Sequence, residues 1–91
     1  MPVEIRLPTL LRSQVGGQST VSVEGATIGE VLGTLVADHP GLSGQVLTDD
    51  GTLHKFVNVY VNDDDVRYLS LLDTPVKDGD EVTILPAVAG G

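Results

Sequence analysis

The segment TIGEVLGTLVADHPG, residues 27–41, carries the strongest structural signal in the chain. Thr27 followed three residues later by Glu30 matches a capping box, the pair of side chains that satisfies free backbone amides at a helix start. Apolar residues then recur at helical spacing and form one stripe, made of Ile28, Val31, Leu32, Leu35 and Val36. Pro40-Gly41 ends the pattern. We expect one amphipathic helix, which must bury its stripe against a second layer.

Segments with a two-residue period flank this helix and predict that layer. Such alternation is typical of strands with one buried face. The alternating segments are residues 3–7, 20–24, 56–61 and 82–85, with a short return strand expected at 66–68. A loop containing Gly16-Gly17 joins the first two, and turns are expected at 62–65 and 78–80 because Asn, Asp and Gly favour them.

One helix among four or five strands predicts an α+β fold, with a mixed sheet and the helix packed across one face. The last strand follows a hairpin and a helix, so it can enter the middle of the sheet beside the first strand. That topology is the ubiquitin-like β-grasp. We expect a globular domain at residues 1–85 and an extended, flexible tail at 86–91, because Pro86 lacks the amide that a strand ladder needs.

Composition excludes several function classes. Five basic and thirteen acidic side chains give a net charge of −8, which argues against nucleic acid and favours partners with a basic surface. No apolar run approaches the roughly 18 residues of a membrane span, and the N-terminus lacks a signal-peptide pattern. The sequence has no cysteine, so disulfides and thiolate catalysis are excluded. A cytoplasmic location is expected.

The face of the sheet away from the helix is a candidate docking surface. Val57, Val59 and Val61 should point toward the helix, which leaves alternate residues on the opposite face. If the strands at 56–61 and 82–85 are neighbours, Phe56, Tyr60 and Leu85 form an apolar patch there, and such patches often mark interaction sites. Two alternatives stay open: isolated surface aromatics are normal, and the irregular segment 66–77 can cover the patch.

The chain ends in Gly90-Gly91. Without Cβ atoms this pair lets the terminal carboxylate approach a partner closely. Six residues from Pro86 onward reach roughly 20 Å when extended, which is enough to enter another protein's active site. The alternative is a frayed end.

Motifs for catalysis or metal binding are missing from the sequence. Asp63-Asp64-Asp65 lacks the alternating ligands and the glycine of a calcium loop, so a solvated turn is expected. His39 and His54 have no partner at zinc-ligand spacing. Neither a nucleophile elbow nor a phosphate-binding glycine loop is present. We expect a protein that other enzymes act on, with no metal or cofactor of its own.

Specific segments give the sequence a family resemblance. Residues 78–82 and 85–91 resemble the C-terminal signature of the MoaD/ThiS sulfur-carrier proteins. Further segments resemble the branch of that family that serves cysteine biosynthesis, and these are residues 8–12, 16–18, 53–62 and 65–67. The resemblance implies that the Gly91 carboxylate is adenylated and converted to a thiocarboxylate, while Gly90, Ala89 and Val88 contact the partner enzymes.

The resemblance also implies the partners. These are an ATP-dependent activating enzyme of the MoeB/ThiF type, a pyridoxal-phosphate (PLP) cysteine synthase that uses O-phosphoserine, and a zinc-dependent peptidase of the JAMM type. ATP, PLP and zinc would belong to them. Other destinations remain open: a molybdopterin synthase small subunit, a sulfur donor for the thiamin thiazole, a ubiquitin-like protein modifier, or a non-catalytic β-grasp interaction module.

Overall fold

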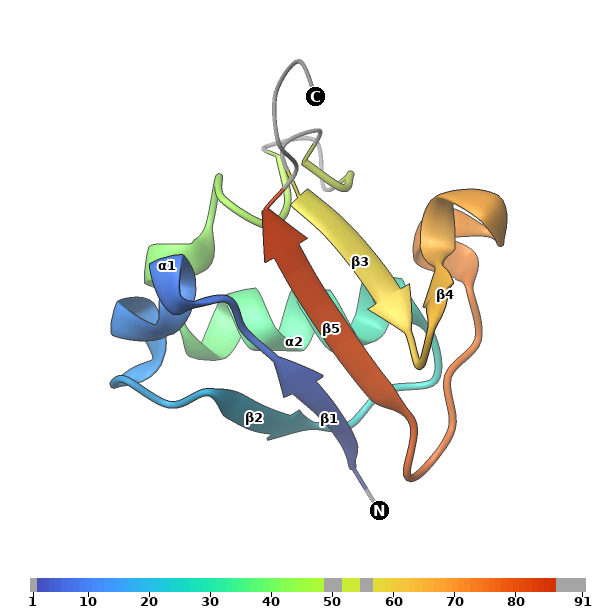
Figure 1. Ribbon diagram of the computed structural model, residues 1–91, viewed down its shortest axis with the longest axis horizontal. Helices are drawn as coiled ribbons and strands as arrows, with labels where there is room; N and C mark the ends of the chain where they lie inside the picture. The colour runs from blue at the N-terminus through green and yellow to red at the C-terminus, as the bar shows by residue number, and fades with distance from the viewer. Residues whose placement is uncertain (1, 49–51, 55–56, 87–91) are drawn as a thin grey trace.

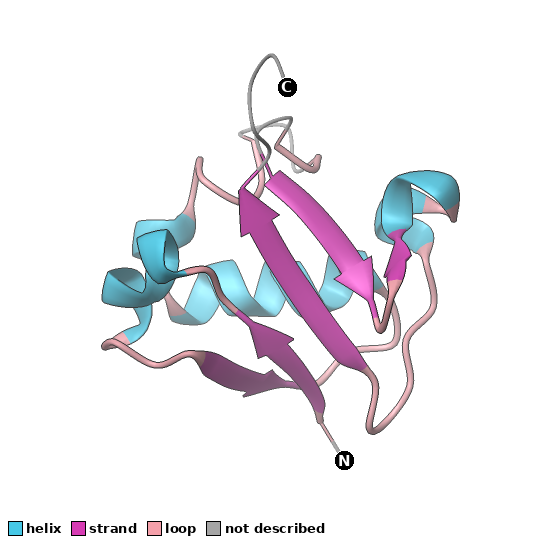
Figure 2. Ribbon diagram, viewed as in Figure 1, coloured by secondary structure: helices cyan, strands magenta, loops and turns pink. Residues whose placement is uncertain are grey.

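The computed structural model describes residues 2–48, 52–54 and 57–86. A five-stranded sheet lies over one long helix, α2 (Ile28–Asp38), which crosses behind the strands in Figures 1 and 2. The strands are β1 (Val3–Arg6), β2 (Thr20–Val23), β3 (Val57–Val61), β4 (Asp64–Asp65) and β5 (Glu81–Pro86). A short helix and four 3-10 turns complete the described elements: α1 (Thr9–Arg12), η1 (Ser13–Val15), η2 (Pro40–Leu42), η3 (Val66–Tyr68) and η4 (Leu71–Asp73).

The strand order is β2-β1-β5-β3-β4, which confirms the predicted β-grasp topology. β5 pairs in parallel with β1, with Ile5 opposite Val82. Its other edge pairs antiparallel with β3, with Val59 opposite Ile84. The last strand in the sequence is therefore the central strand of the sheet, held by hydrogen bonds along both edges.

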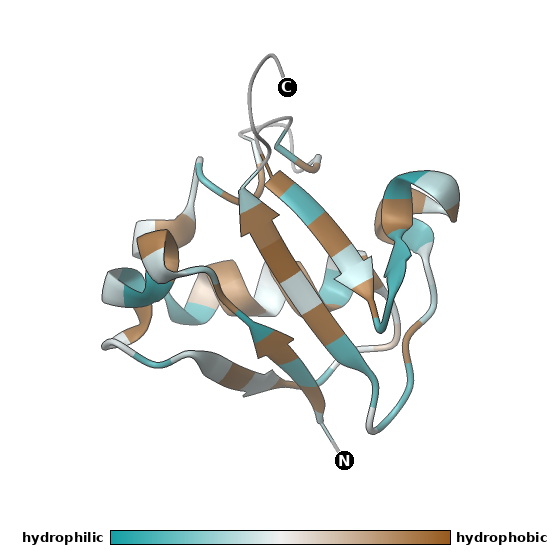
Figure 3. Cartoon of the chain, viewed as in Figure 1, coloured by the Kyte–Doolittle hydropathy of each residue, from teal (hydrophilic) through white to brown (hydrophobic). Residues whose placement is uncertain are grey.

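The core lies between the sheet and α2. Val57, Val59 and Val61 are buried, as the alternation predicted, and Figure 3 shows apolar bands separated by more polar ones along β3. From α2, Ile28, Val31, Leu32 and Leu35 are buried, and Val36 packs against them half-buried. Burying one such aliphatic side chain stabilises the fold by about 1.5–3 kcal/mol. The two apolar patterns therefore explain the two-layer architecture.

The predicted helix start is confirmed, with one change. Thr27 Oγ1 accepts a hydrogen bond from the Glu30 amide at 3.2 Å. Glu30 Oε1 reaches back to the Ala26 amide at 3.4 Å, one residue before the usual partner in a capping box. The Thr27 hydroxyl thus satisfies an amide that the first turn of the helix leaves free, and the Glu30 carboxylate satisfies the amide of Ala26 just before the helix.

The connection between β1 and β2 differs from the predicted loop, because it contains α1 and η1. The Leu11 amide donates to the Pro8 carbonyl at 2.9 Å, and Arg12 Nε donates to the Leu7 carbonyl at 3.1 Å. Gly17, at a φ of 82°, then donates to the Arg12 carbonyl at 2.7 Å and ends the helical stretch. The four residues of α1 alone are too few to show a helical period; the one sequence hint is that apolar Leu11 and Val15, both buried in the structure, are spaced four residues apart across α1 and η1.

The short strand predicted at residues 66–68 was wrong. The return strand is β4, which ends at Asp65, just before the predicted segment. Asp64 pairs with Val61 across a turn that includes Asn62 at a φ of 56°. Asp65 Oδ1 then accepts from the Arg67 amide at 2.8 Å and starts η3 in place of a strand. A side-chain bond of this kind competes with strand pairing.

Candidate functional site

The end of β5 is where the chain leaves the sheet toward its C-terminus. Val82 and Thr83 pair with β1, whereas Leu85 and Pro86 pair only with β3, opposite Asn58 and Val57. Pro86 is thus the last residue of the strand, one residue beyond the predicted end at Leu85. Five residues follow it in the sequence. The predicted site residues Val88, Ala89, Gly90 and Gly91 lie outside the described residues, as does Phe56.

Arg67 fixes the start of β3 beside this point. Its Nη2 donates to the Val57 carbonyl at 2.9 Å, and its Nη1 donates to Asn58 Oδ1. Those two residues are the ones opposite Pro86 and Leu85. The root of the tail, which we define as Leu85 and Pro86, therefore rests on a strand that is braced from its outer side.

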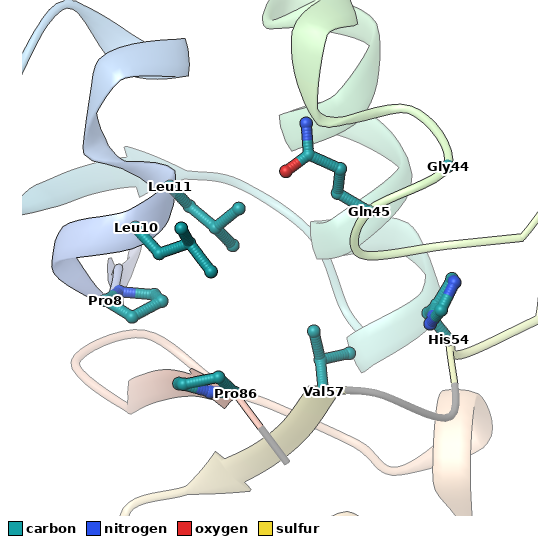
Figure 4. A pocket seen from close by; sticks show the side chains of 8 residues that line it. All are labelled: Pro8, Leu10, Leu11, Gly44, Gln45, His54, Val57 and Pro86. Carbon is teal, nitrogen blue, oxygen red and sulfur yellow. The ribbon is translucent and has the colours of Figure 1, made fainter. Parts of the chain in front are cut away.

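A hollow of about 230 Å³ opens at the root of the tail. We call it the root hollow, and Figure 4 shows its labelled side chains arranged around one opening. They come from four parts of the chain, namely the α1 region (Pro8, Leu10, Leu11), the connection between η2 and β3 (Gly44, Gln45, His54), the start of β3 (Val57) and the end of β5 (Pro86). Leu10 is 74% exposed although it is a large apolar side chain. Sequence reasoning missed this hollow because the α1 region was read as loop.

The outer face of the sheet brings two predicted residues together. Tyr60 lies opposite Thr83, and Leu85 lies two residues further along the same strand. Tyr60 and Leu85 line one shallow hollow of about 250 Å³, together with Asn62, Asp63 and Thr83. Leu85 is 43% exposed. The predicted proximity of Tyr60 and Leu85 is therefore confirmed, and their role in partner binding stays a prediction.

The segment 66–77 does not run across this outer face. It packs against the start of α2, where the Ile28 amide donates to the Thr74 carbonyl at 2.9 Å and the Val76 amide donates to the Ala26 carbonyl at 3.0 Å. In Figure 1, η3 and η4 lie beyond β4 at the edge of the sheet. The alternative that this segment covers the patch is thus excluded for Tyr60 and Leu85.

The face of the sheet that points away from α2 carries side chains of both charges, and acidic side chains are the more numerous of those named here. Arg6 Nε lies 3.4 Å from Glu81 Oε2 in an exposed ion pair between β1 and β5. Asp63 borders the hollow that holds Tyr60 and Leu85. A partner docking here meets apolar side chains edged by carboxylates, which favours a complementary basic rim.

Two kinds of feature are absent from the part of the chain that the structure describes, namely clusters of metal-binding side chains and membrane-spanning helices. Within it, groups of three or more His, Asp or Glu side chains placed to hold a metal are absent. Asp65, from the acidic cluster, caps η3 instead. Within the same residues, no helix has the length and apolar character needed to cross a membrane.

Comparison with known proteins gives consistent matches over the whole length. A model described as the ThiS family matches residues 5–91. The sulfur carrier protein CysO of Mycobacterium bovis is 50% identical over 93 aligned residues, covering 100% of both chains. A chain in the crystal structure of the Amycolatopsis orientalis BexX/CysO complex has a TM-score of 0.88 and 46% identity, covering 98% of this chain and 99% of that one. Small archaeal modifier protein 3 of Haloferax volcanii is 38% identical, again over 100% of both chains.

Proposed function

The chain belongs to the ThiS family, and from that premise we propose that it is a sulfur carrier protein whose Gly91 carboxylate becomes a thiocarboxylate. It acts as a protein-bound co-substrate and not as an enzyme. The observation that best supports this proposal is the position of β5: its last residue, Pro86, is held in the sheet, and Ala-Val-Ala-Gly-Gly follows. The sheet thereby fixes the residue from which a terminal segment of small residues begins.

The proposed chemistry begins with activation. A Gly91 carboxylate oxygen attacks the α-phosphorus of ATP, and pyrophosphate leaves as the acyl adenylate forms. Sulfide then attacks the carbonyl carbon and AMP leaves, so one oxygen of the carboxylate has been replaced by sulfur. A free carboxylate is a poor acyl donor, whereas the adenylate supplies a good leaving group. An activating enzyme of the MoeB/ThiF type supplies the ATP site.

The proposed destination of the sulfur is cysteine. A PLP-dependent synthase eliminates phosphate from O-phosphoserine, and the thiocarboxylate sulfur adds to the β-carbon of the resulting aminoacrylate. Acyl transfer from sulfur to nitrogen leaves cysteine joined to Gly91 by an amide bond, which a zinc-dependent JAMM-type peptidase hydrolyses. Support for this destination is the 50% identity with CysO across the full length of both chains. ATP, PLP and zinc are bound by the partners, and we propose that the whole sequence runs in the cytoplasm.

Intact mass spectrometry tests the activation step. Incubation with an activating enzyme, ATP and sulfide should add about 16 Da, the difference between sulfur and oxygen. Deleting Gly91 should abolish the gain because the acceptor carboxylate is displaced, and Gly90→Val should do so because a Cβ-branched side chain blocks close approach to the enzyme. Circular dichroism of both variants should remain native. Loading of the Gly91-deleted chain at the wild-type rate would refute the proposal.

A second candidate function is a protein modifier that forms an isopeptide bond through Gly91. The 38% identity with small archaeal modifier protein 3 supports it. The two functions give different products from the same adenylate. Adding O-phosphoserine and the synthase should yield a cysteine–carrier adduct if the chain serves cysteine synthesis, whereas attachment to lysine side chains of other proteins would favour the modifier. Transfer to neither acceptor leaves the molybdopterin and thiazole destinations.

A further inference from the structure

Two of the five basic side chains in the sequence lie together beside the root of the tail. Arg6 and Arg12 line a hollow of about 350 Å³ that Leu85 also borders, and we call it the arginine hollow. The same two side chains border an adjoining hollow of about 200 Å³, whose remaining lining is Ser19 and Thr20. None of the Asp and Glu residues that the structure describes lines either hollow. Both therefore offer positive charge and neutral polar groups to a partner.

Arg12 carries the positive charge of this site that no carboxylate balances. It is half-buried, and its Nε donates to the Leu7 carbonyl, a neutral acceptor, at 3.1 Å. Among the described residues, Arg12 forms no ion pair. The N–H groups on its two Nη nitrogens are therefore available, while the bond to Leu7 already holds the planar guanidinium in place. Such a fork matches the geometry of a carboxylate, which it binds through two hydrogen bonds.

Acidic side chains on the same face of the sheet do not cancel this charge. Glu81 Oε2 lies 3.4 Å from Arg6 Nε, but both side chains are well exposed, so solvent screens the pair and Arg12 is not part of it. Glu4 lies opposite Glu81, two residues from Arg6. Asp63 borders the hollow on the β3 side of Leu85, whereas the arginine hollow lies on the β1 side. The charge offered to a partner therefore changes sign across the root of the tail.

We propose that the arginine hollow receives an acidic side chain of the enzyme that adenylates the C-terminus, and that its carboxylate pairs with Arg12. This inference rests on the proposed sulfur-carrier function. An enzyme that holds Gly91 in its active site encloses a tail of roughly 20 Å and therefore meets Leu85 at the root of that tail. Adenylation precedes every destination of the sulfur and the protein-modifier alternative as well. The activating enzyme is thus the partner that all of these functions share.

A carboxylate is the complementary occupant because the hollow is a basic point on a molecule with a net charge of −8. A second copy of the chain is a poor occupant, since two such copies repel each other. An enzyme that pairs with Arg12 on one side of the root and places a cation near Asp63 on the other binds the carrier in one orientation. The contact orients the tail before any chemistry takes place, so its loss should raise KM.

The test uses the full chain and its purified activating enzyme, with ATP and sulfide, and follows the initial loading rate by intact mass at increasing carrier concentration. Arg12→Glu reverses the charge in the hollow. The matched control is Lys77→Glu, at an exposed cation of the loop before β5 that lines neither hollow. Each of these exchanges changes the net charge from −8 to −10, so the general effect of charge on encounter is the same in both. Arg12→Lys keeps the charge but not the fork, and thermal melts establish that all three variants fold.

We expect Arg12→Glu to raise the KM for the carrier about tenfold at low salt, with kcat within about twofold of wild type, because a repulsion replaces an attraction at the interface. The difference should shrink at high salt, which screens the charges. Arg12→Lys should raise KM only about threefold because it keeps the charge. Lys77→Glu should stay within about twofold of wild type. Equal KM values for Arg12→Glu and Lys77→Glu would overturn the inference. An equal rise for Arg12→Glu and Arg12→Lys would also overturn it, because the lost bond to Leu7 would then be the cause.

Other occupants of the hollow give different results, each with a normal KM for Arg12→Glu in the loading assay. Slower transfer of sulfur from this variant to O-phosphoserine would mean that the synthase occupies the hollow. A melting temperature that added phosphate raises for wild type but not for Arg12→Glu would mean a small anion, and self-association that only wild type shows would mean a second copy. Each of these results would make the assignment to the activating enzyme wrong. Failure of the wild-type chain to exchange oxygen for sulfur would instead reject the sulfur-carrier function itself, so a defect in one variant and a defect in every chain are distinguishable.

Discussion

Val59 and Tyr60 are consecutive residues of β3 whose side chains serve different layers. Val59 is fully buried against α2, opposite Ile84 of the central strand. Tyr60 is half-buried on the outer face, where it shares a hollow with Leu85. The two-residue period of a strand thus separates a residue that stabilises the fold from one available to a partner.

Truncating these neighbours to alanine should give opposite results. Val59→Ala removes two buried methyl groups from a packed core and should lower the free energy of unfolding by about 2 kcal/mol. Tyr60→Ala should cost clearly less stability but weaken binding to the activating enzyme. Urea unfolding measures the first effect, and titration calorimetry with the enzyme measures the second. Strong unfolding of Tyr60→Ala, with unchanged affinity in its folded fraction, would show that this ring belongs to the core.

At the scale of the secondary-structure element, the start of α2 joins two parts of the fold. Thr27 caps the helix through its hydroxyl, and its backbone also forms a bridge with Pro75. The Ile28 amide, which the helix leaves free, donates to the Thr74 carbonyl at 2.9 Å. The loop that leads from η4 toward β5 is therefore anchored on the same turn of helix that begins the core.

Thr27→Ala should lower the free energy of unfolding by about 1 kcal/mol, because the Glu30 amide loses its acceptor. Thr27→Ser keeps the hydroxyl and serves as the matched control, with a smaller loss expected. Thermal or urea unfolding followed by circular dichroism measures both. Equal losses for Ala and Ser would mean that the methyl group, and not the hydrogen bond of the cap, accounts for the stability.

Elements whose apolar pattern repeats over several residues, or that begin with a recognisable cap, were predictable from the sequence. Elements of one turn were not. The stripe of α2 and the alternation in β3 each span five or more residues, so their buried faces were identified correctly. α1 has four residues and η3 has three, which is about one turn and shows no period. The Asp65 side chain decides the conformation at η3, and that competition depends on one local hydrogen bond.

The same reasoning explains what could be predicted of the site. Tyr60 and Leu85 were placed together because their strands had a readable phase and the topology put those strands side by side. The root hollow needed α1 beside His54 and Pro86, segments far apart in the sequence that only the folded chain brings together.

For the molecule as a whole, topology and charge act together. The central position of β5 gives the C-terminus a rigid base, and the root hollow lies next to that base. Thirteen acidic side chains against five basic ones leave a strongly negative molecule. This charge favours encounter with a basic partner but repels itself within one small domain, so it should lower the stability of the free protein.

Salt should therefore stabilise the isolated chain. Raising NaCl from about 0.01 M to about 0.5 M shortens the Debye length from roughly 30 Å to less than 10 Å and screens the repulsion between surface carboxylates. We expect the melting temperature to rise by about 3–5 °C, equivalent to somewhat less than 1 kcal/mol for a domain of this size. The double variant Asp63→Lys, Asp64→Lys isolates the electrostatic part, because it changes the net charge from −8 to −4 and leaves Asp65 in place to cap η3. Its melting temperature should be higher than that of wild type at low salt and should respond less to added NaCl. The same salt dependence in both chains would show that a general salt effect on apolar burial, and not charge repulsion, governs the response.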